Sequence, residues 1–126
     1  MRKILHYIYY WLPPLVWMGI IYFMSAQRSI GMTHNKTSDF FVFKSLHMVE
    51  YAFLFFLFYR AFQTITSRYI FWCSFIFTIL NSVTDEFHQL FISTRQGSFR
   101  DMLFDIAGML IMYGMIKNIR VLRRLL

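Results

Sequence analysis

Acidic and histidine side chains that could carry acid–base chemistry occur in three short stretches of this sequence. The stretches cover residues 47–50, 85–89 and 101–105. A carboxyl group and an imidazole held close together can accept and donate protons during a reaction. We therefore expect an acid–base set here, and its candidate members are Glu50, Asp85, Glu86 and His88.

Other polar side chains in or beside these stretches could bind a ligand. Arg95 and Arg100 are suited to a phosphate or another anion, because guanidinium groups pair with oxyanions through two parallel hydrogen bonds. Ser98 is a candidate nucleophile, although capping of the following helix suits it better. The candidate ligand-binding residues are Lys44, His47, Tyr51, Gln89, Arg95, Ser98, Arg100, Asp101 and Asp105.

The sequence supports metal and cofactor binding less well. Carboxylate oxygens and imidazole nitrogens ligate several divalent metals. The spacing of these acids and histidines nevertheless matches no established metal motif, so we expect no cofactor and leave a divalent metal as an open alternative. The single cysteine, Cys73, lies in an apolar run and is expected to be a packing residue.

Four apolar segments have to position these polar groups, at about residues 4–26, 45–62, 68–91 and 99–119. Each is near the roughly 17–25 residues that cross hydrocarbon as a helix. A helix is the economical choice because a single segment in lipid must satisfy its own backbone hydrogen bonds. We predict an all-α membrane protein, a bundle of four transmembrane helices in one domain spanning residues 1–126.

The composition favours the same class of protein. Of the 126 residues, 58% are hydrophobic and 15% are charged. A soluble domain typically carries about 45–50% apolar and about 25% charged residues. A globule this small could not bury the excess. The net charge of +7 is then a topology signal, and we expect no nucleic-acid partner.

The distribution of basic residues sets the predicted orientation. With four spans, the two termini and the second loop share one side of the membrane. Eight cations lie on that side: Arg2, Lys3, Arg60, Arg68, Lys117, Arg120, Arg123 and Arg124. Five lie on the other: Arg28, Lys36, Lys44, Arg95 and Arg100. The positive-inside rule then places both termini in the cytoplasm.

This topology brings the three polar stretches to one depth, near the outer interface. At about 100° per residue, the polar side chains of each stretch gather on one face of their helix. We expect the three faces to point at a shared interior, where Gly108 would allow another helix to approach closely. Pro13-Pro14 should kink or locally unwind the first helix.

Three motifs together resemble the VanZ-like family. They are Lys44-x-x-His47-x-x-x-Tyr51, Thr84-Asp85-Glu86-Phe87-His88-Gln89-x-Phe91 and Arg95-x-x-Ser98-x-x-Asp101-x-x-x-Asp105-x-x-Gly108. The resemblance implies a small multi-pass protein of the bacterial plasma membrane. For some members it also implies lowered susceptibility to glycopeptide antibiotics, teicoplanin above all. It does not imply a particular reaction.

Three functions are compatible with these observations. The first is an enzyme acting on a lipid-linked envelope intermediate at the outer face, and the second is a non-catalytic module that binds a lipid headgroup, a cell-wall precursor or a lipoglycopeptide. The third, a proton or ion pathway, is least favoured because the inner halves of the helices lack ionisable residues. The sequence leaves open the ligand, any turnover, a role in resistance and the oligomeric state, for which a homodimer is one candidate.

Overall fold

The described part of the protein is helical and contains no strand. A computed structural model describes residues 1–27, 36–89 and 99–126. Its helices are α1 (Arg2–Gln27), α2 (Lys36–Phe62), α3 (Ile70–Gln89), α4 (Phe99–Asn118) and the short α5 (Arg120–Arg124). The prediction of an all-α protein is confirmed.

Two helix boundaries differ from the prediction. α2 begins at Lys36 instead of about residue 45. The added segment, residues 36–44, contains Lys36 and Lys44, and charged residues of this kind do not end a helix because lysine has good helix propensity. The C-terminal segment also continues as α5 beyond a break at Ile119, whose backbone is extended with φ −95° and ψ 112°. Apolar content therefore predicts the presence of each long helix better than it predicts where the helix ends.

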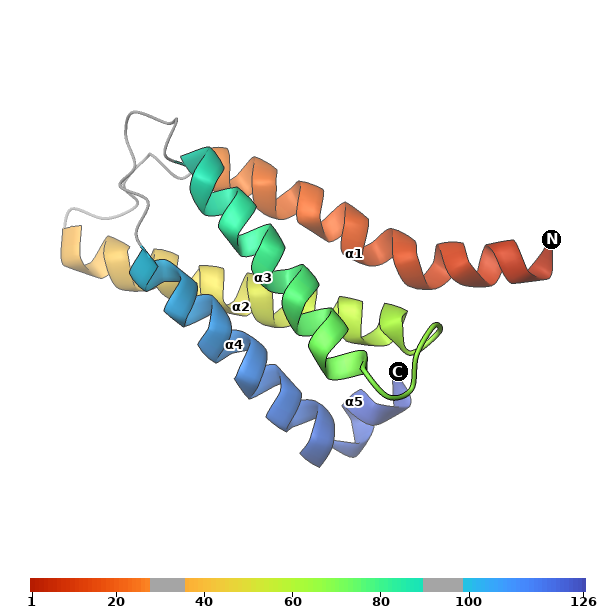
Figure 1. The fold of residues 1–126 in the computed structure, drawn as a ribbon. Helices are drawn as coiled ribbons and strands as arrows, with labels where there is room; N and C mark the ends of the chain where they lie inside the picture. Colours follow the sequence, from red (N-terminus) through yellow and green to blue (C-terminus); the bar gives the residue numbers. More distant parts are fainter. Residues whose placement is uncertain (28–35, 90–98) are drawn as a thin grey trace.

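α2 is the central helix of the bundle. It packs against α1, α3 and α4, while α3 also contacts α1 and α4. The C-terminal ends of α1 and α3 and the N-terminal ends of α2 and α4 gather at one end of the bundle (Figure 1). The turn between α2 and α3 lies at the other end, near α5. Consecutive long helices thus run in opposite directions.

Two prolines lie inside α1 without interrupting it. Pro13 and Pro14 are both helical, so the chain does not unwind there. Figure 1 shows α1 bending along its length, and its N-terminal part projects beyond the other helices. A bend is the expected result, since proline removes a backbone hydrogen bond and its ring crowds the preceding turn.

The apolar core is built around α2. Residues 54–58 are all buried, as expected for a helix that is covered on all sides. One cluster joins Leu54 and Phe58 to Ile21 of α1. A second cluster joins Phe55 to Met109 of α4. The aromatic residues in the middle of α2 are therefore part of the hydrophobic core of the bundle.

A glycine allows α2 and α4 to approach closely. A Cβ atom at Gly108 would collide with the backbone carbonyl oxygen of Met48 and would lie 3.0 Å from the Met48 Cγ atom. A Cβ at Gly114, also in α4, would meet nothing within 4 Å. The predicted close approach at Gly108 is confirmed.

α3 has an inverted pattern of burial. Its buried residues are all polar: Ser74, Thr78, Ser82, Asp85 and Gln89. Large apolar residues of the same helix, including Trp72, Phe77 and Leu80, are exposed. The hydroxyls of Ser74 and Thr78 donate to carbonyl oxygens one turn earlier, at 2.6 and 2.7 Å, which satisfies them within the helix.

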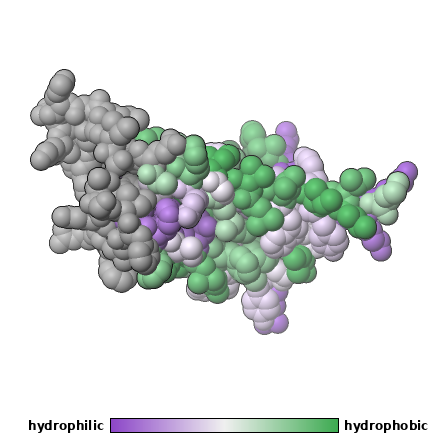
Figure 2. Space-filling view, turned by 90° about the horizontal axis from the view of Figure 1, so that it is seen from above, coloured by the Kyte–Doolittle hydropathy of each residue, from purple (hydrophilic) through white to green (hydrophobic). Residues whose placement is uncertain are grey.

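The exterior of the molecule is strongly apolar. Exposed large hydrophobic residues occur on all the long helices, and Figure 2 shows apolar atoms over most of the face in view. By length and composition, one helix of the described residues, Arg2–Ala26, qualifies as a membrane span. No other helix of the described residues meets the same criteria.

Candidate functional site

Four helices bring buried polar side chains together at the end where α1 and α3 finish. We call this group the polar cluster. Its members are Ser25 of α1, His47 and Glu50 of α2, Ser82, Asp85 and Gln89 of α3, and Asp105 of α4. Each of them is at most 8% exposed, so the cluster lies between the helices. Figure 2 shows hydrophilic atoms at this end of the bundle, next to apolar side chains.

Asp85 is the centre of the polar cluster. Its Oδ2 atom accepts hydrogen bonds from the Ser25 hydroxyl at 3.0 Å and from the Gln89 amide nitrogen at 2.8 Å. The Gln89 amide nitrogen also donates to the Ser25 hydroxyl oxygen. The same Asp85 oxygen lies 3.5 Å from His47 Nε2. This one carboxylate therefore connects α1, α2 and α3.

His47 lies between two carboxylates. Its Nε2 atom faces Asp85, and its Nδ1 atom is 3.5 Å from Glu50 Oε2 on the same helix. An imidazolium in this position would be paired with a carboxylate on each side. A neutral imidazole would have a carboxylate beside its N–H group, and its other nitrogen would carry a lone pair. His47 is therefore close to one carboxylate on its own helix and one on α3.

Asp105 ties α4 to the cluster. Its carboxylate is fully buried and accepts a hydrogen bond of 2.5 Å from the Ser82 hydroxyl of α3. The other carboxylate oxygen, Oδ1, is buried and has no hydrogen-bond partner within the described residues. The sequence prediction that α2, α3 and α4 point polar side chains at a shared interior is thus confirmed for His47, Asp85 and Asp105.

A second group of contacts holds α2 in position beside the cluster. Tyr51 is fully buried, its ring is 5.1 Å from the His47 ring, and its hydroxyl accepts a 3.5 Å hydrogen bond from Asn81. The Trp17 indole donates to the Glu50 backbone carbonyl at 3.1 Å. Tyr51 belongs to the predicted ligand-binding set, and the structure places it beside His47 in the interior of the bundle.

Two members of the predicted acid–base set lie at the flank. Glu86 is half-buried beside the cluster. His88 lies with its ring 4.2 Å from the Tyr22 ring of α1, at an interplanar angle of 41°. The structure therefore brings Glu50 and Asp85 together around His47, and it places His88 against α1.

The remaining predicted residues are described only in part. Lys44 is half-buried in α2. Arg95 and Ser98 lie outside the described residues, as do the side chains of Arg100 and Asp101, although both belong to α4. Within the described part of the chain, no three His, Cys, Asp or Glu side chains are grouped so that they could hold a metal ion.

Two members of the cluster, Ser25 and Ser82, are outside the predicted acid–base and ligand-binding sets. The sequence interpretation of Ser82 is a residue that hydrogen-bonds to another helix, and its bond to Asp105 confirms that interpretation. Both are small hydroxyl residues next to apolar segments, where such residues usually donate to their own helix, as Ser74 and Thr78 do. Here the Ser25 and Ser82 hydroxyls instead donate to carboxylates on other helices. One signal was available for Ser82, since it precedes Asp85 by three residues and shares a face with it.

Comparison with known proteins places the chain in a family. The family model described as VanZ/LLP1 matches residues 7–122. This match covers nearly the whole chain, and the chain therefore belongs to this family, as its motifs suggested. The family is generally membrane-associated. No curated protein and no solved structure gives a significant match.

Proposed function

We propose that this VanZ/LLP1-family protein spans the bacterial plasma membrane four times and binds a lipid-linked envelope molecule in its polar cluster. The observation that carries the proposal is the inverted polarity of α3, which buries its polar residues and exposes apolar ones. In a bilayer, apolar side chains contact the lipid tails at no energetic cost, and polar side chains pack against other helices.

The proposed orientation has the polar cluster at the outer face. The turn between α2 and α3 and the C-terminal segment lie at the opposite end of the bundle (Figure 1). That end carries Arg60, Arg68, Lys117 and the basic α5 helix. By the positive-inside rule, this basic end lies in the cytoplasm together with both termini.

The chemistry of the cluster favours a ligand with hydroxyl, amide or amine groups. Glu50, Asp85 and Asp105 supply carboxylate oxygens, which accept hydrogen bonds from such groups. Sugars and peptides of a cell-wall precursor carry these donors, and so does a lipoglycopeptide such as teicoplanin. The phosphate of a lipid-linked precursor would be held by Arg95 and Arg100, the predicted anion-binding residues. Its lipid tail would lie against the apolar exterior.

Turnover of the ligand is the stronger of two forms of this proposal. The position of His47 between Glu50 and Asp85 suits a general acid–base pair. In this form His47 and Glu50 exchange protons with the ligand, and Asp85 orients the imidazole. Glu86 and His88 remain candidate members of the set.

Binding without turnover is the second form. It is favoured by the hydrogen bonds that Asp85 accepts from Ser25 and Gln89. A carboxylate engaged in this way acts as a fixed part of the binding site, and the site then needs no proton transfer. The two forms share the ligand and differ only in whether a modified product appears.

The decisive experiment compares cells that express the wild-type protein, Asp85→Asn or Thr84→Ala. Thr84 is the matched control, because it is adjacent but exposed, and its hydroxyl donates to Leu80 of its own helix. Teicoplanin susceptibility and mass spectra of the lipid-linked precursors are measured for each at equal membrane expression.

We expect Asp85→Asn to abolish any difference from cells without the protein, and Thr84→Ala to behave as wild type. A modified precursor that depends on the wild-type protein would establish turnover. Unchanged precursors with a retained phenotype would establish binding alone. If Asp85→Asn behaves as wild type in both measurements, the polar cluster is not the functional site.

A further inference from the structure

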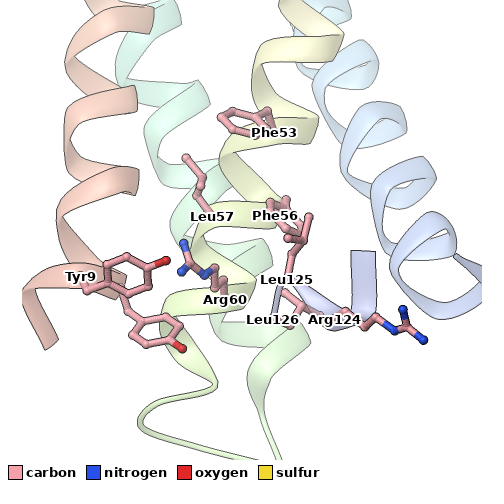
Figure 3. Close-up of a pocket in the computed structure, with 9 residues that line it drawn as sticks. Tyr9, Phe53, Phe56, Leu57, Arg60, Arg124, Leu125 and Leu126 are labelled. Atoms are coloured by element: carbon pink, nitrogen blue, oxygen red, sulfur yellow. The ribbon is translucent and has the colours of Figure 1, made fainter. Parts of the chain in front are cut away.

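A groove at the basic end of the bundle has the features of a second ligand site. We call it the basal groove, and its volume is about 460 Å³. Tyr9 and Tyr10 of α1 line one side, and Phe53, Phe56, Leu57 and Arg60 of α2 line the other, with residues 124–126 closing it (Figure 3). It lies at the opposite end of α2 from the polar cluster.

The Arg60 guanidinium lies over two tyrosine rings in this groove. Its central carbon lies 4.5 Å from the Tyr9 ring centroid and 4.7 Å from that of Tyr10. A cation–π contact places the charge over the ring face and does not itself consume the N–H donors of the guanidinium. The Nε atom is buried and has no hydrogen-bond partner within the described residues. Arg60 is therefore positioned to hold an oxyanion at its edge.

The rest of the groove is apolar and runs along α2 towards the middle of the bundle. Phe53 precedes Arg60 by seven residues, which is about 10 Å along a helix. Phe56 and Leu57 lie between them, and Phe53 is 38% exposed. An elongated apolar chain could lie along this surface while an attached anion stays beside Arg60.

We infer that the basal groove binds an anionic phospholipid of the inner leaflet. Its phosphate would pair with the in-plane N–H groups of Arg60, and one acyl chain would lie against Phe53, Phe56 and Leu57. Arg124 stands at the rim with its side chain directed outwards (Figure 3), where it adds positive charge. The inference rests on the proposed membrane orientation and is independent of any ligand in the polar cluster.

The test measures lipid binding to the full chain in detergent by native mass spectrometry. Phosphatidylglycerol and phosphatidylcholine with the same acyl chains are titrated into the wild type, Arg60→Gln, Arg60→Lys and Arg68→Gln. Arg68 is the matched control, because it is an exposed arginine beyond the same end of α2, with its guanidinium over the Tyr69 ring at 5.4 Å.

We expect the wild type to bind phosphatidylglycerol at least about tenfold more tightly than phosphatidylcholine, because its headgroup is net negative and attracts the charges of Arg60 and Arg124, whereas the choline ammonium offsets the charge of the phosphate. Arg60→Gln should abolish the preference, and Arg60→Lys should reduce it, since lysine keeps the charge and loses the planar fork. Arg68→Gln should change affinity by less than about twofold, as exposed charges contribute little.

Three results would overturn the inference: equal binding of both lipids to the wild type, equal losses in Arg60→Gln and Arg68→Gln, or displacement of the lipid by millimolar inorganic phosphate. Asp85→Asn serves to separate the two sites. It should leave phosphatidylglycerol binding unchanged, so that failure of one proposal does not decide the other.

Discussion

The carboxylate of Asp85 and the hydroxyl of Ser25 are 60 positions apart in the sequence, and their oxygens lie 3.0 Å apart. This contact joins the C-terminal end of α1 to the C-terminal end of α3. Through this contact α1 adds to the polar cluster, whose other members come from α2, α3 and α4.

Replacing Ser25 should therefore affect both stability and function. Ser25→Ala removes one hydrogen bond to Asp85 and should lower the free energy of unfolding by about 1 kcal/mol, typical of hydrogen bonds between membrane helices. Thermal unfolding of the purified protein in detergent measures this. Thr84→Ala, which removes only a hydrogen bond within α3, should cost clearly less. Equal losses would show that the contact between α1 and α3 contributes nothing specific.

Ser82 and Asp105 should behave as an energetically coupled pair. Ser82→Ala leaves the fully buried Asp105 carboxylate without its donor, at an expected cost of about 1–3 kcal/mol. In a double-mutant cycle with Asp105→Ala, the coupling energy should be about 0.5–3 kcal/mol. Additive effects of the two substitutions would argue that the hydrogen bond carries no weight in the fold.

The two glycines of α4 should respond in opposite ways to substitution by alanine. Gly108→Ala places a methyl group against the Met48 carbonyl and should destabilise the protein by about 1–3 kcal/mol, the usual cost of overpacking. Gly114→Ala meets open space and should be neutral or stabilising by about 0.5–1 kcal/mol. Denaturant unfolding of both variants checks this, and a similar response would refute the close contact of α2 and α4.

The proposed topology can be tested with single cysteines. In a Cys73→Ser background, Arg68→Cys lies in the turn between α2 and α3, and Thr94→Cys lies in the loop that the sequence predicts to be outside. A membrane-impermeant maleimide added to intact cells should label Thr94→Cys and spare Arg68→Cys, which should react only after lysis. The reverse pattern would invert the orientation, and labelling of both would rule out four spans with these loops on opposite sides.

The helical class and the meeting of three helices were predictable from the sequence. Apolar run lengths give the number of long helices, and the helical period places His47, Asp85 and Asp105 on faces that meet. Helix ends were harder, because the lysines near the start of α2, Lys36 and Lys44, are compatible with a helix. The hydropathy of the sequence therefore did not indicate that α2 starts at Lys36.

The detailed composition of the site was only partly predictable. Spacing along α3 puts His88 close in angle to Asp85, yet the packing of α1 turns its ring to Tyr22. The sequence also does not tell whether a serine hydroxyl donates to its own helix or to a neighbour. The Ser74 hydroxyl donates within its own helix, whereas the Ser82 hydroxyl donates to Asp105 of α4. The difference depends on which helix packs against each serine.

The order of synthesis fits the way in which the buried acids are satisfied. Asp85 on α3 is met by Ser25 and His47, and Asp105 on α4 is met by Ser82. In each case the interhelical partner lies on a helix that leaves the ribosome earlier. In the proposed four-span topology, an acidic residue entering the bilayer thus finds its partner already in place. The cost of inserting each acid is offset by the assembled part of the bundle, which makes the insertion of α3 and α4 dependent on the helices before them.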